Sequence, residues 1–176
     1  MALILILVVE GATILRIRSL LTVHAFVGML LIPLVALKLA STGWRSARYY
    51  SHAEAYVLQG PPKLVLRVLV APVVVLSTIV VFGTGVALLS LHRTQGTLVG
   101  LHKASFVVWL GATGVHVLAH LAKLPRFIWR RVPGVGVRVA ILGATLAAGA
   151  LVAVATLPGA ERLQDHATAR FGVDRR

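Results

Sequence analysis

The stretch "LHKASFVVWLGATGVHVLAHL", Leu101 to Leu121, is apolar enough to cross a membrane, yet it contains three histidines: His102, His116 and His120. An α-helix has about 3.6 residues per turn, so the fourteen steps from His102 to His116 make nearly four turns and the eighteen steps to His120 make five. The three imidazoles therefore lie on one face of one helix. Ionisable residues inside a membrane are rare and usually functional, so this face is a candidate site.

The composition supports the membrane interpretation. Of the 176 residues, 58% are hydrophobic and 13% are charged, whereas a soluble domain is about 45–50% apolar and about 25% charged. The chain is therefore predicted to be an all-α integral membrane protein. The absence of cysteine excludes disulfides, cysteine-ligated iron–sulfur clusters and thioether-attached haem.

Four apolar runs reach the length of about 20 residues that a membrane-spanning helix needs. The predicted spans are about Ser19–Ala40, Leu64–Leu91, Leu98–Ala122 and Val137–Leu157. A shorter apolar run, about Ala2–Leu15, precedes them. The predicted fold is a four-helix membrane bundle with an additional short N-terminal helix. Residues 1–160 are expected to form a single transmembrane domain, and residues 161–176 a polar C-terminal tail.

The formal net charge of +13 comes largely from basic residues between the apolar runs. This arrangement is explained by membrane topology and contact with anionic lipids rather than by nucleic-acid binding. The loop after the first span and the loop after the third share one face of the membrane and carry most of the Lys and Arg. The positive-inside rule predicts that both loops are cytoplasmic in a multi-pass protein of the cell membrane.

The first span contributes one histidine, His24, about five residues from its start, and His102 lies about four residues into the third span. Because these helices run in the same direction, the two imidazoles are expected at matching depth. Haem b needs two axial nitrogens, an apolar slot and cations for its propionates. The basic residues near this depth are Arg16, Arg18, Arg93 and Lys103. A haem at His24 and His102 is thus predicted; the alternatives are hydrogen bonds between helices or a divalent metal.

The spacing of His102 and His116, together with "VHAFVGMLLIPLVALKLASTGWR" and "LHKASFVVWLGATGVH", resembles membrane b-type cytochromes. These include cytochrome b561-like proteins, the membrane subunits of formate dehydrogenases and hydrogenases, ferric-reductase-like proteins, and a set of small actinobacterial membrane proteins. The resemblance implies haem b between helices, with His116 as a candidate ligand of a second haem iron. It also implies electron transfer between the quinone pool and a redox partner subunit.

The sequence departs from the two-haem pattern, because Lys38 stands fourteen residues after His24, where a second histidine would be needed. Lys38 is interpreted as reaching the cytoplasmic headgroups. One haem b is therefore predicted, and a second only if His52 or a partner subunit completes a site with His116 or His120. Otherwise these two histidines could line a quinone pocket or a proton path, or bond to another helix.

Three functions remain open at this point. The first is an electron-transfer cytochrome, a subunit rather than a self-contained enzyme. The second is a haem-free membrane scaffold or accessory subunit, and the third is a small transporter or metal-handling protein. Glu10 is a candidate for proton uptake if the N-terminal helix spans the membrane, and is merely hydrated if that helix lies at the interface. His92 is interpreted as a surface residue, and His166 is given no role.

Overall fold

The computed structural model describes residues 2–51, 70–121 and 134–173, and these residues form helices joined by turns. The helices are α1 (Ala2–Ile14), α2 (Ile17–Tyr50), α4 (Ala71–Ser90), α5 (Thr97–Leu121) and α7 (Val135–Val173). Within the described ranges, four helices are long and apolar enough to cross a membrane, and α1 is shorter. The predicted all-α membrane bundle with a short N-terminal helix is confirmed.

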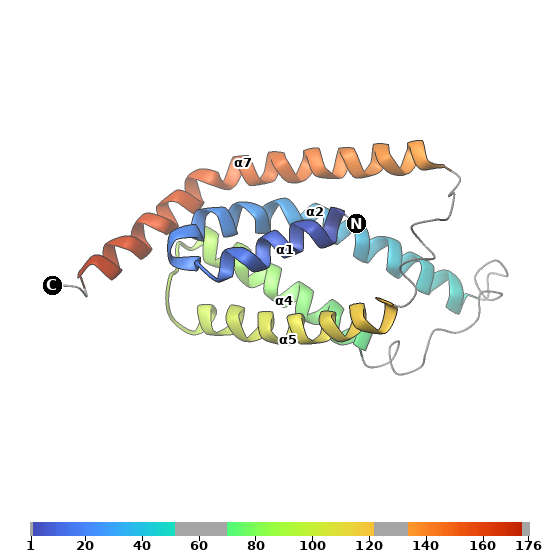
Figure 1. Ribbon diagram of the computed structural model, residues 1–176, viewed down its shortest axis with the longest axis horizontal. Coiled ribbons are helices and arrows are strands. Elements are labelled where there is room, and N and C mark those ends of the chain that lie inside the picture. The colour runs from blue at the N-terminus through green and yellow to red at the C-terminus, as the bar shows by residue number, and fades with distance from the viewer. Residues whose placement is uncertain (1, 52–69, 122–133, 174–176) are drawn as a thin grey trace.

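Two helices are longer than the apolar runs that predicted them. Helix α2 continues to Tyr50 and α7 continues to Val173, beyond the predicted ends at Ala40 and Leu157. The added segments are polar but contain good helix formers such as Ala, Arg, Glu and Gln, so the helices continue where the hydrophobic signal stops. Pro158 lies inside α7, and proline in a helix interior produces a kink. Figure 1 shows α7 changing direction along its length.

The helices form two hairpins and one long flanking helix. In the first hairpin α1 packs against α2, and in the second α4 packs against α5. Helix α7 lies along α2, and a smaller contact between α2 and α4 joins the hairpins. Figure 1 shows the α1–α2 and α4–α5 turns at the same end of the bundle. Residues close to these two turns therefore lie at one depth.

Two clusters of buried residues hold these pairs together. Val27, Leu31 and Leu34 of α2 form the first cluster, against side chains of α1, α4 and α7. The second joins Leu89 of α4 to Ala160 and Leu163 of α7. The segment of α7 beyond Pro158 is thus packed on the bundle.

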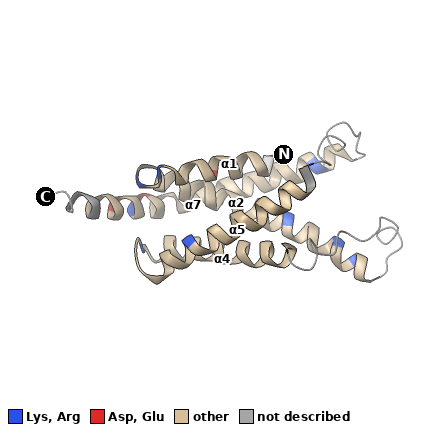
Figure 2. Ribbon diagram, turned by 60° about the horizontal axis from the view of Figure 1, so that its bottom comes forward, with Lys and Arg blue, Asp and Glu red and all other residues tan. Residues whose placement is uncertain are grey.

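Most of the large apolar side chains lie on the outside of the bundle. Leu5 of α1, Leu76 of α4, Val107 and Leu118 of α5, and Leu151 of α7 are each more than 60% exposed. Contiguous apolar surface on this scale indicates contact with lipid. Figure 2 shows Lys and Arg gathered toward the ends of the described helices, with a middle free of them. Both features fit a protein that crosses a bilayer several times.

Candidate interhelical histidine site

The α1–α2 hairpin places two side chains of α1 against His24. Nδ1 of His24 lies 2.9 Å from Thr13 Oγ1 and 3.0 Å from Glu10 Oε1. Gly28, one turn after His24, leaves room for the carboxylate, because a Cβ there would lie 3.3 Å from Glu10 Oε1. A short turn between antiparallel helices is what brings Glu10 and Thr13, before the turn, to His24 after it.

The α4–α5 hairpin repeats this arrangement around His102. Nδ1 of His102 lies 2.9 Å from Thr84 Oγ1 of α4. The next residue, Gly85, lies beside the ring, since a Cβ there would be 3.3 Å from His102 Cε1. Further along the hairpin, Trp109 Nε1 donates a hydrogen bond of 3.0 Å to Thr78 Oγ1. Each hairpin thus holds one imidazole with a threonine from its other helix.

The threonine hydroxyls determine which ring nitrogen carries the proton. Thr13 donates its hydroxyl proton to the carbonyl of Glu10 at 2.6 Å, and Thr84 donates to the carbonyl of Val80 at 2.7 Å. Each hydroxyl oxygen is therefore left to accept from Nδ1–H of its histidine. The Glu10 carboxylate also accepts from His24. In the neutral form of each ring Nδ1 therefore carries the proton, and Nε2 carries the lone pair.

The two imidazoles lie close together, one from each hairpin, in an edge-to-face arrangement. Their ring centres are 6.4 Å apart and their planes are inclined by 79°. A metal–imidazole bond is about 2 Å long and the ring centre lies about 1 Å behind the nitrogen, so two imidazoles in line on one iron have centres about 6 Å apart. The 6.4 Å separation is therefore close to that of two imidazoles that would hold one haem iron, with Nε2 of each ring as the ligand atom. The predicted matching depth of His24 and His102 agrees with this geometry.

Glu10 is the acidic group of the site, and its role was only partly expected. Its side chain is 15% exposed, and Oε2 is buried without a hydrogen-bond partner among the described residues. Burying an unpaired carboxylate oxygen is unfavourable, and acids at membrane depth are usually functional. Ligating histidines commonly donate their second N–H to a carboxylate, which fixes the ring orientation. Glu10 and Thr13 together supply such an acceptor for His24.

The predicted propionate-binding cations lie at the same end of the bundle as the histidine pair. Arg16 and Arg18 are at the α1–α2 turn, Arg93 is at the α4–α5 turn, and Lys103 follows His102. All four side chains are exposed. The structure therefore brings these cations to the expected level, close to the surface.

The other residues considered as ligands of a second haem are not part of this pair. His116 lies further along α5 with an exposed side chain, and Lys38 is an exposed residue of α2. His52, and the side chain of His120, lie outside the described residues. The second haem therefore stays a prediction.

The contacts of Thr13 and Thr84 were not predicted from the sequence, although a signal was available. Glu10 lies six residues before Arg16 and His24 lies eight after it. Thr84 precedes the α4–α5 turn by about the interval at which His102 follows it. Folding each hairpin about its turn would have paired these residues.

Fold and site together define a helical, multi-pass membrane protein with a histidine pair between two helical hairpins. No family model, curated protein or solved structure matches this sequence.

Proposed function

We propose that the protein is a membrane b-type cytochrome that passes electrons between the quinone pool and a redox partner subunit. The observation that carries this proposal is a pair of imidazoles with ring centres 6.4 Å apart, each donating Nδ1–H within its own hairpin, which leaves Nε2 of each as the nitrogen that could bind iron. His24 and His102 would hold haem b through their Nε2 atoms. When bound, the haem supplies reversible one-electron transfer.

The protein's own groups would orient and tune the site. Glu10 and Thr13 fix the rotation of the His24 ring, and Thr84 fixes that of His102. Hydrogen bonds to ligating imidazoles raise their basicity and affect the potential of a bound metal. Arg16, Arg18, Arg93 and Lys103 would neutralise propionates at the end of the bundle, because a charged carboxylate is unfavourable in hydrocarbon.

The test is a reduced-minus-oxidised absorption spectrum of the purified protein, produced with an adequate haem supply. A sharp b-type α-band is expected, with about one haem per chain by pyridine haemochrome assay, because His24 and His102 are one pair of ligands. About two haems per chain would support the cytochrome and add a second site, with His116 or His120 as the first residues to examine. Absence of haem would contradict the proposal.

One observation favours a second function, that of a haem-free scaffold or accessory subunit. Both Thr–His contacts join the two helices of a hairpin, and such hydrogen bonds by themselves stabilise helix pairs in membranes. The spectrum separates the two functions, since the scaffold has no visible absorption band.

We also propose the orientation that the positive-inside rule predicts, with Ser46 on the cytoplasmic side and the α4–α5 turn opposite. Because the chain has no cysteine, a thiol-reactive label can attach only to a cysteine that is introduced by mutation. With an impermeant maleimide added to intact cells, Gln95→Cys is expected to be labelled and Ser46→Cys only after the membrane is opened. Labelling of both without opening would refute the orientation.

A further inference from the structure

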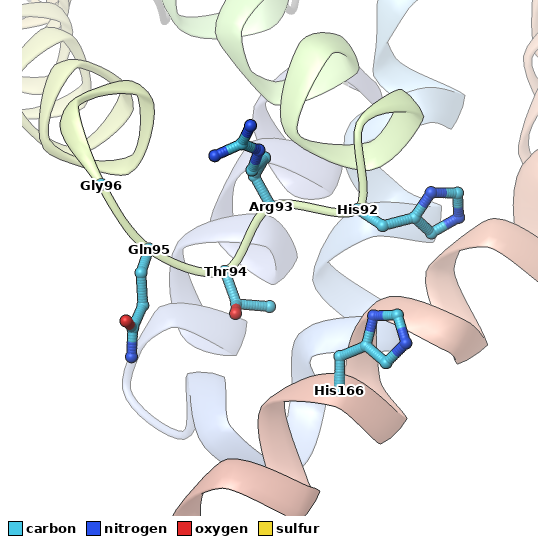
Figure 3. A pocket seen from close by; sticks show the side chains of 6 residues that line it. All are labelled: His92, Arg93, Thr94, Gln95, Gly96 and His166. Carbon is cyan, nitrogen blue, oxygen red and sulfur yellow. The ribbon is translucent and has the colours of Figure 1, made fainter.

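A second pair of histidines lies outside the bundle core, at the α4–α5 turn. His92 of the turn and His166 of α7 have ring centres 6.4 Å apart, with planes inclined by 71°. They line a cavity of about 460 Å³ together with Arg93, Thr94, Gln95 and Gly96. Figure 3 shows the two imidazoles next to each other at one side of this cavity, with the Arg93 guanidinium directed away from them.

The backbone at His92 is unusual for a residue with a side chain. Helix α4 ends in a Schellman motif: the amide of His92 bonds to the Leu89 carbonyl at 3.4 Å, and that of Arg93 to the Leu88 carbonyl at 3.1 Å. His92 occupies the left-handed position of this motif, with φ of +49°, where glycine is the common residue. The chain therefore keeps an imidazole where an unstrained turn would have glycine. Residues held in such conformations are concentrated at functional sites.

Helix α7 is fixed in the position that brings its imidazole to this turn. Gly159 passes close to the end of α4, since a Cβ there would lie 3.6 Å from Leu89 Cδ1 and 4.0 Å from His92 Nε2. His166 follows Gly159 by seven residues, nearly two helical turns, so the two lie on one face of α7. Gln164 anchors the intervening turn by donating a 2.7 Å hydrogen bond to the Arg18 carbonyl.

In the described part of the chain, one ring nitrogen of His92 has no partner, and the His166 side chain is exposed. Nε2 of His92 is buried and has no hydrogen-bond partner among the described residues. Buried polar atoms in native proteins are nearly always partnered, so an unpartnered imidazole nitrogen on a residue that lines a cavity indicates a missing ligand. Imidazole is the nitrogen ligand that Zn²⁺, Cu²⁺ and Ni²⁺ prefer, whereas Mg²⁺ and Ca²⁺ prefer oxygen.

We propose that His92 and His166 form a binding site for a divalent late first-row transition metal, separate from the His24–His102 pair. The described residues offer no third histidine, cysteine, aspartate or glutamate for the same ion. Two imidazoles would therefore hold the metal, and water or an external ligand would fill the remaining positions. Such a site is open to exchange, unlike a closed structural site with four protein ligands.

The experiment is a titration of tag-free, detergent-solubilised protein with Cu²⁺, followed by electron paramagnetic resonance, with Zn²⁺ added as a competitor. One Cu²⁺ per chain with hyperfine structure from two nitrogens is expected, displaced by excess Zn²⁺. The variants His92→Gly and His166→Ala are each expected to weaken binding by about tenfold or more. Gln95→Ala, which lines the same cavity without an imidazole, is the control and should bind as the wild type does.

His92→Gly is expected to fold, because glycine suits the left-handed position and should leave the turn intact or more stable. Weaker metal binding by this variant can therefore be attributed to the missing imidazole. The haem spectrum is measured on the same samples, so failure of the metal site is distinguishable from failure of the cytochrome proposal. Unchanged Cu²⁺ affinity in both histidine variants would overturn the proposal. So would a signal with one nitrogen that depends on only one of the two histidines.

Discussion

Replacing either His24 or His102 by alanine is expected to abolish stable haem binding and to remove the b-type absorption band. Each substitution takes away one of the two nitrogens that would hold the haem. Among the described residues, Nδ1 of the remaining imidazole contacts threonine and, for His24, the Glu10 carboxylate, and these are oxygen groups. The measurement is haem per chain by pyridine haemochrome assay, after purification at equal protein yield.

Thr84→Val tests a smaller change, in which the His102 ligand is kept but loses a hydrogen bond. Valine has nearly the shape of threonine but cannot accept the proton of His102 Nδ1, so the ligand stays while its orientation is weakened. Removing such an outer contact typically lowers metal affinity by about 10–100-fold. Thr84→Val is therefore expected to retain haem that is lost more readily on dilution or washing. Thr13→Val is expected to weaken haem binding less, because Glu10 remains as a second acceptor for His24 Nδ1.

His166→Ala is the matched control, because it removes a histidine at the same end of the bundle that is not in the proposed haem site. It should bind haem as the wild type does. Wild-type haem content in both His24→Ala and His102→Ala would rule out these residues as ligands. Haem loss in all three variants would indicate that the substitutions disturb the fold rather than a ligand.

The membrane bundle could be predicted from the sequence because its main signal is long apolar runs, and length alone decides whether a helix crosses the bilayer. The depth of His24 and His102 followed from the same runs. The contact of each imidazole with its threonine could not be predicted in this way. It depends on how the two helices of each hairpin are rotated relative to each other. Apolar patterning does not specify this rotation, because nearly every face of these helices is apolar.

The pair formed by His92 and His166 could not be predicted from the sequence for a different reason. Prediction from hydropathy ended the last span at Leu157, so His166 fell in a segment treated as a polar tail. In the structure the helix continues through Pro158 and packs Leu163 against the bundle. A proline that bends a helix and a proline that ends one cannot be distinguished without the tertiary contacts beyond it.

Small residues of α7 allow close helix packing, and Gly149 makes the tightest such approach among the described glycines. A Cβ at Gly149 would lie 2.5 Å from the backbone oxygen of Leu30 in α2, and Ala153, one turn later, is fully buried. In lipid, helices associate through close van der Waals packing, because burial of apolar surface from water gives no driving force there. This contact is therefore central to the α2–α7 pair.

Gly149→Ala is expected to destabilise the protein by about 2 kcal/mol, because the added methyl group meets backbone atoms that cannot rotate away and the helices must separate. The variant Gly143→Ala is the control on the same helix, since a Cβ there has nothing within 4 Å. That change should be neutral or stabilising by up to about 1 kcal/mol, owing to the higher helix propensity of alanine. The measurement is thermal unfolding in detergent, followed by circular dichroism.

Equal midpoints for the two variants would show that α7 does not contact α2 through Gly149. A lower midpoint for Gly149→Ala alone would establish the contact that also fixes the register of α7, on which the position of His166 beside His92 depends.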